Sequence, residues 1–122
     1  MAVEVDLTGG AVRVTATGKQ PLQGILNVAG MDQVDLMCEL LGWEGTFGAS
    51  GPTIRILTSM HSDSDLLYWY VVGAFSGTSL KGSDRMDKAN FAQLLKYIRW
   101  EVSNLDSATS LSFAIRGMGR SN

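Results

Sequence analysis

Cysteine, histidine and proline are scarce in this chain, which has one cysteine, one histidine and two prolines among 122 residues. The single cysteine, Cys38, excludes an internal disulfide and any metal site built from several thiolates. The single histidine, His61, lies beside Ser62 and Asp63 in a polar stretch. Neighbours in such a turn do not converge on a nucleophile in the way that a catalytic triad requires. We therefore expect the protein not to be an enzyme.

Neither a large charge of one sign nor a long apolar run is present. The formal net charge is −2, and the basic residues do not cluster, which argues against a nucleic-acid partner. No stretch approaches the roughly 20 apolar residues that cross a bilayer. The first residues have neither the basic start nor the apolar segment of a signal peptide. We expect a protein that is made in a cytoplasm and does not associate with membranes.

Glycine, by contrast, is abundant, and the 14 glycines separate short apolar runs, as turns between strands require. Apolar and polar side chains alternate over residues 3–7 and again over residues 110–116, which is the pattern of half-buried strands. Residues 53–60 and 66–75 are rich in β-branched and aromatic side chains. A length of 122 residues fits one domain. We expect a single domain over residues 1–122, with a mobile tail from about residue 117.

Two segments, residues 33–42 and 90–103, fit both a helical and a strand period. As strands they bring the total to about eight, the number typical of an all-β jelly-roll sandwich, which is the fold we predict. As helices they would make the fold α+β, and this alternative stays open. Residues 76–89 are polar and mixed in charge, which predicts a long surface loop.

The second half of the chain resembles a known family. Thr53–Met60 is followed by a polar turn, Trp69 lies in the next strand, residues 96–100 read Lys-Tyr-Ile-Arg-Trp, and residues 113–117 read Phe-Ala-Ile-Arg-Gly. This order resembles the discoidin-type, galactose-binding-like jelly roll over roughly residues 53–117. The resemblance supports a strand over residues 94–102.

The chain departs from that family in three places. Lys96 stands where the family's "R-Y-I-R" strand has its first arginine, Ser62–Asp65 replaces an Asp-Gly turn, and a lone Cys38 cannot form the family's disulfide. The chain is also shorter than an ordinary discoidin domain. Short, cysteine-poor jelly rolls of this kind are similar to small structural proteins of tailed phages, so the resemblance implies a place in the virion.

The predicted strand over residues 66–75 has an apolar outward face. If Leu67, Trp69 and Val71 point into the core, four residues point outward: Leu66, Tyr68, Tyr70 and Val72. Soluble monomers rarely expose such a patch, and tyrosines are favoured at interfaces. We therefore predict an interface at these four residues, joined by Arg116 and Arg120 near the C-terminus. A strand that is buried on both faces within the sandwich is the alternative.

These observations predict a capsid decoration protein of a phage-like particle. It would dock on the major shell protein and gain affinity from many repeated contacts. A homo-oligomer is expected, and a trimer would match the threefold sites of a capsid lattice.

A carbohydrate-binding module is the alternative function. Three aromatic residues are candidates to stack on a sugar ring: Trp43, Tyr68 and Tyr70. Asp63 and Asp65 are weak candidates for calcium, which binds carboxylate oxygens, although paired acids in a turn are more often simply solvated. No other cofactor is expected.

Overall fold

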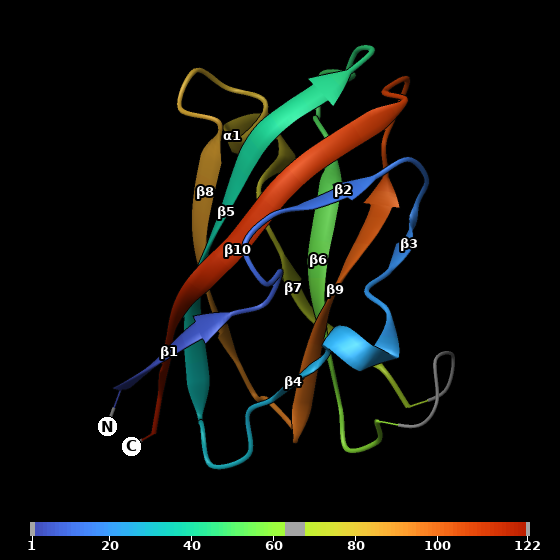
Figure 1. The fold of residues 1–122 in the computed structure, drawn as a ribbon. Helices are drawn as coiled ribbons and strands as arrows, with labels where there is room; N and C mark the ends of the chain where they lie inside the picture. Colours follow the sequence, from blue (N-terminus) through green and yellow to red (C-terminus); the bar gives the residue numbers. More distant parts are fainter. Residues whose placement is uncertain (1, 63–67, 122) are drawn as a thin grey trace.

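The computed structural model describes residues 2–62 and 68–121 as two antiparallel sheets packed face to face (Figure 1). Sheet A contains β1 (Ala2–Asp6), β2 (Val12–Val14), β5 (Gln33–Glu44), β8 (Met86–Ala92) and β10 (Ser110–Arg120). Sheet B contains β3 (Gly18–Lys19), β4 (Leu26–Asn27), β6 (Thr53–Ser59), β7 (Tyr70–Ala74) and β9 (Tyr97–Asn104). Two short turns of helix lie in the connections: η1 (Leu22–Gly24) and α1 (Gly77–Leu80).

The strand order is that of a jelly roll. Sheet A runs β1-β10-β5-β8, with β2 also on β10, and sheet B runs β3-β9-β6-β7, with β4 also on β9. The chain thus passes back and forth between the sheets in two interleaved Greek keys, which is the jelly-roll arrangement. The predicted all-β sandwich is confirmed, and the α+β alternative is wrong. Residues 33–42 belong to β5, and residues 90–103 form the end of β8 and most of β9.

β5 shows why the strand period prevails in the first ambiguous segment. Four alternate residues are buried in the core: Val34, Leu36, Cys38 and Leu40. The residues between them point to the other face of sheet A and are partly exposed. This alternation buries a complete face of the strand against sheet B, whereas a helix would have divided these residues between its two sides.

β5 and β10 form the long central pair of sheet A, which runs from Gln33 opposite Arg120 to Glu44 opposite Ser110 with a β-bulge between Ser112 and Phe113. A side chain at Gly117 would place its Cβ 1.8 Å from the carbonyl oxygen of Asp35, so the two backbones meet more closely there than any other residue allows. Residues 117–120 are paired with β5 on one side and β1 on the other. The expectation of a mobile tail from residue 117 is therefore wrong.

The core lies between the sheets and contains two edge-to-face aromatic pairs. Trp100 of sheet B packs on Phe113 of sheet A with ring centroids 5.1 Å apart, and Phe75 packs on Phe91 at 5.4 Å. A Cβ on Gly73 of β7 would lie 2.9 Å from the ring of Phe91. The absence of a side chain at Gly73 thus lets the two sheets close along the flank formed by β7 and β8.

Two further expectations from the sequence are corrected. Residues 76–89 are not one long loop, because they contain α1, whose Leu80 is buried, and the start of β8. Among the described residues of the 66–75 segment, the strand begins only at Tyr70, since Tyr68 has a φ of 68° that an extended strand does not accommodate. The described chain contains no helix with the length and apolarity needed to cross a bilayer.

Candidate functional site

Two residues of the predicted interface stand on the surface where β6 is followed by β7. Tyr68 is 53% exposed and Tyr70 is 60% exposed. Met60, directly after β6, is 58% exposed, and Val71 in β7 is 51% exposed. The Tyr68 ring lies 4.4 Å from the His61 ring. We call these four large apolar side chains the hairpin patch: Met60, Tyr68, Tyr70 and Val71.

The orientation expected for Val72 is wrong. Val72 packs against the core while Val71 faces solvent, which reverses the predicted alternation. The cause is a β-bulge, because Ile56 pairs with Gly73 while the next residue, Leu57, pairs with Val71. An extra residue in one strand changes which side chains share a face. Leu66 of the predicted interface and the calcium candidates Asp63 and Asp65 lie outside the described residues.

Trp43, a glycan-binding candidate, lies near the end of β5 and packs partly against the core. Its ring centroid is 5.0 Å from that of Phe47. The guanidinium carbon of Arg85 lies 5.0 Å from the centroid of the same ring. Contacts within the chain thus occupy much of the aromatic surface that a sugar would need, and Trp43 does not join Tyr68 and Tyr70 in one site.

The two C-terminal arginines lie on the outer face of sheet A, the face turned away from sheet B. Arg120 forms an ion pair with Asp35 of β5. The same carboxylate accepts a hydrogen bond of 2.8 Å from the side-chain amide of Asn90 in β8. This network connects β10, β5 and β8 across the face. Arg120 therefore stabilises sheet A and is not available to pair with another chain.

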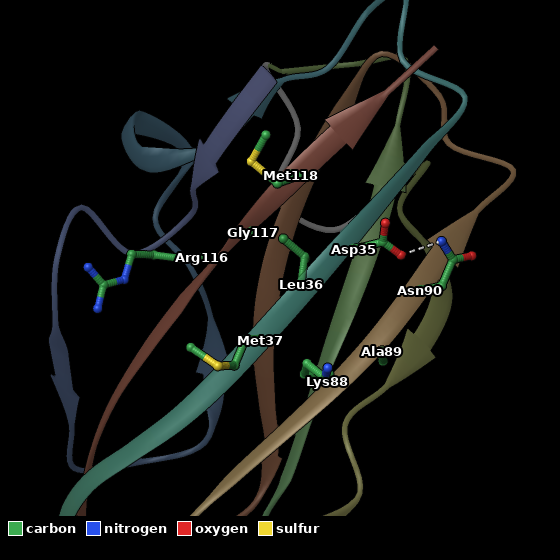
Figure 2. A pocket seen from close by; sticks show the side chains of 9 residues that line it. All are labelled: Asp35, Leu36, Met37, Lys88, Ala89, Asn90, Arg116, Gly117 and Met118. Atoms are coloured by element: carbon green, nitrogen blue, oxygen red, sulfur yellow. Dashed lines mark hydrogen bonds between the residues drawn. The ribbon is translucent and has the colours of Figure 1, made fainter. Parts of the chain in front are cut away.

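A shallow hollow of about 390 Å³ lies on this same face (Figure 2). It is lined by residues of three adjacent strands: Asp35, Leu36, Met37, Lys88, Ala89, Asn90, Arg116, Gly117 and Met118. Figure 2 shows Lys88 on β8 and Arg116 directed to the far side of β10, with Met37 between them. The hollow therefore combines thioether and aliphatic surface with a cation on each side.

Lys88 and Arg116 differ from the other cations of the protein. Eight of the ten lysines and arginines have an acidic, carbonyl or aromatic partner within the described chain: Arg13, Lys19, Arg55, Lys81, Arg85, Lys96, Arg99 and Arg120. Lys88 and Arg116 make no such contact with any described residue. Both remaining cations thus line the same hollow.

Cys38 is fully buried in the core. Burial raises the pKa of its thiol well above the ordinary value, and the negative charges of Asp87 and Glu39 raise it further. A protonated, inaccessible thiol is a poor nucleophile and metal ligand. Over the described ranges, no three histidine, cysteine, aspartate or glutamate side chains are placed to share a metal ion.

A buried polar pair on sheet B was missed by the sequence analysis. Arg99 of β9 is 1% exposed; it donates a hydrogen bond to the carbonyl oxygen of Gln20 and lies 4.9 Å from the centroid of the Trp69 ring. The Gln20 side chain donates to the carbonyls of Leu7 and Gly24 at 2.8 and 2.7 Å. The strand predicted over residues 94–102 did not indicate that Arg99 is buried.

Comparisons with protein-family models, with curated proteins and with solved structures find no match for this chain. The resemblance to discoidin-type domains therefore stays a prediction from the sequence.

Proposed function

We propose that the protein is a non-catalytic structural component of a phage-like particle, a capsid decoration protein that docks on the shell through the hairpin patch. The observation that carries the proposal is the exposure of this patch. Met60, Tyr68, Tyr70 and Val71 are each more than half exposed at one end of one hairpin. Tyr70 and Val71 are consecutive in β7 and project from its two faces, so the patch surrounds the edge of sheet B at this end of the hairpin. Exposed large apolar side chains are typical of sites that bind another protein.

The architecture and the chemistry of the patch both support this proposal. Jelly rolls recur among viral capsid domains, although a fold alone does not define a function. Tyrosine and methionine are enriched in interfaces between proteins. On a repeating lattice, a contact that is weak in a single copy gains strength if the protein also self-associates, since each bound copy raises the effective concentration of the next. A trimer is the form of self-association that we propose for a threefold lattice site.

Co-sedimentation tests the proposal. Particles from a lysate of the source are pelleted at high speed, washed with salt and analysed by quantitative mass spectrometry. We expect this protein in a fixed ratio to the major shell protein. Recovery only in the soluble fraction would overturn the proposal.

Recombinant variants locate the docking surface by rebinding to stripped particles. Tyr70→Ser combined with Val71→Ser should reduce the bound fraction at least tenfold. Leu41→Ser is the matched control, because Leu41 is also an exposed large apolar residue but lies on sheet A. Equal loss of binding by the double variant and the control would exclude the hairpin patch.

Carbohydrate binding is the second candidate function, favoured by the exposed ring of Tyr68, which lies beside the His61 ring at an interplanar angle of 34°. Tyrosine can pack on a sugar ring and hydrogen-bond through its hydroxyl. A glycan array, read with and without calcium, tests this candidate. A glycan whose binding is lost in Tyr68→Ala and kept in Trp43→Ala would support it, and a blank array under both conditions would exclude it.

A further inference from the structure

The methionines of this protein are placed unusually. Methionine is ordinarily a residue of the core, yet none of the five methionines in the described chain is fully buried. Met86 and Met118 are both more than a third exposed, and Met37 is partly exposed. Flexible, polarisable methionine side chains on a surface are typical of sites that accept another chain.

Three of these methionines form a diagonal across the outer face of sheet A. Met118 of β10 lies opposite Asp35 of β5, and Met86 of β8 lies opposite Glu39 of β5. Met37 lies on β5 midway between these two positions. Diagonal neighbours in a sheet are about 7–8 Å apart, so the three side chains span about 15 Å. We call this set the methionine stripe: Met86, Met37 and Met118.

The charges around the stripe have a definite order. Arg116 and Lys88 are the cross-strand neighbours of Met37, so positive charge flanks the middle of the stripe. At its ends, Glu39 is the neighbour of Met86, and Glu4 is the neighbour of Met118. The carboxylate of Asp35 is already matched by Arg120. Asp6 of β1 lies opposite Arg116 on the other side of β10. Lys88 and Arg116, which form no ion pair within the described residues, thus lie to either side of the central methionine (Figure 2).

We propose that the methionine stripe is the docking site for an amphipathic helix of another polypeptide, with carboxylates flanking the middle of the helix's apolar ridge. A span of about 15 Å corresponds to about three helical turns. A helix about 10 Å wide covers the stripe and leaves Arg116 and Lys88 at its two sides to meet those carboxylates. A second sheet would instead bury the surrounding charges, which is costly without exact pairing.

A second copy of this chain cannot supply the helix. The longest helix in the described part of the chain, α1, has four residues, which is about one turn. The occupant is therefore a different segment, and the site is separate from the hairpin patch on sheet B. This inference does not depend on the proposed function.

Methionine methyl NMR tests the proposal, because every methionine reports on its own part of the surface. The probes are two synthetic 14-residue helices with the same leucine ridge, one with glutamates and one with lysines beside its middle. We expect the glutamate peptide to shift the methyl signals of Met37, Met86 and Met118 and to leave Met31 and Met60 unchanged. It should reach half-saturation at a concentration at least tenfold lower than the lysine peptide.

Charge reversal completes the test. The double variant Lys88→Glu with Arg116→Glu should reverse the preference between the two peptides. Lys96→Glu, remote from the stripe, should leave the preference unchanged, and Lys88→Gln with Arg116→Gln replaces the reversed pair if that pair does not fold. Three results would overturn the proposal: no shift with either peptide, equal response to both, or shifts centred on Met31 and Met60.

Discussion

The outer faces of the two sheets contrast sharply, although the same alternation generates both. On sheet B, the outward residues Leu57 and Arg99 are 3% and 1% exposed. Trp69 stacks on Arg99, and Gln20, just before η1, accepts its hydrogen bond. Segments of the same chain thus close this face. On sheet A, the outward residue Met118 is 42% exposed and lines a hollow of about 390 Å³.

The difference shows that a strand pattern defines two faces but not what covers them. A core face is closed by the opposite sheet in either case. An outer face is closed only where a connecting segment folds back over it, and otherwise it is available to solvent or a partner. Substitutions on the covered face of sheet B should therefore cost more stability than substitutions on the open face of sheet A.

Replacing Gly117 with valine should have the largest effect, because it separates β10 from β5 at their closest approach. A Cβ there would lie 1.8 Å from the Asp35 carbonyl oxygen, and neither backbone can move without disturbing the central pair of sheet A. We expect a loss of about 4 kcal/mol or more in the free energy of unfolding, or failure to fold. Urea denaturation measures the loss.

Gly42→Ala is the control for this prediction. Gly42 lies in β5 as well, but a Cβ at this position would meet no atom within 4 Å. Its replacement should change stability by less than about 0.5 kcal/mol. Similar losses for the two variants would show that the contact at Gly117 does not hold the pair together.

Removing the buried arginine of sheet B should have the next largest effect. Arg99→Met leaves the Gln20 carbonyl without its donor and removes the partner of the Trp69 ring. We expect a loss of about 2–4 kcal/mol, since a buried acceptor is left unsatisfied. Arg116→Met on the open face is the matched control and should cost less than about 0.5 kcal/mol. Equal costs in urea titrations would contradict the contrast between the faces.

The secondary structure and the buried face were predictable from the sequence where apolar and polar residues alternate strictly. β10 was predictable because Leu111, Phe113 and Ile115 alternate with more polar residues, whereas residues 33–42 of β5 fitted a helical period as well. The first half of β8 was mistaken for a loop because residues 86–89 include Asp87 and Lys88, and charged residues are common in an edge strand. The face of Val72 was not predictable, since the bulge in β7 depends on its pairing with β6.

The surface features could not be predicted because they depend on contacts between distant residues. Arg99 is buried through Gln20, 79 positions earlier in the chain. The methionine stripe exists only once the registers of β10, β5 and β8 are known. Tyr68 and Tyr70 were predicted to be exposed from the alternation of a strand over residues 66–75, and both are exposed although the strand begins only at Tyr70.

The free energy of unfolding should fall at alkaline pH because the buried thiol of Cys38 keeps its proton. Its thiol pKa is raised in the folded state by burial, from an ordinary value of 9.0. The thiol therefore does not alter the pH dependence of stability below about pH 9. Above that pH, the unfolded chain releases a proton that the folded chain retains, and stability falls by up to about 1.4 kcal/mol per pH unit.

Urea titrations between pH 8 and pH 10.5 measure this slope. Cys38→Ala removes the thiol and should show a shallower decline than the native protein over the same pH range. Native Cys38 should also fail to react with a thiol reagent at pH 8 until the protein unfolds. Identical slopes, or rapid reaction of the native protein, would show that the thiol is accessible.

The smallest loss in the free energy of unfolding is expected on the open face of sheet A. Met118→Ala removes a side chain that is already 42% exposed, so little apolar surface returns to water, and the cost should be below about 0.5 kcal/mol. Leu57→Ala, at an outward position of sheet B that is 3% exposed, should cost about 2–3 kcal/mol, because the segments above it hold a cavity open. Thermal unfolding of both variants checks the pair. A large loss for Met118→Ala would mean that the methionine stripe stabilises the sheet itself, whereas near-neutrality leaves its apolar surface available for a partner.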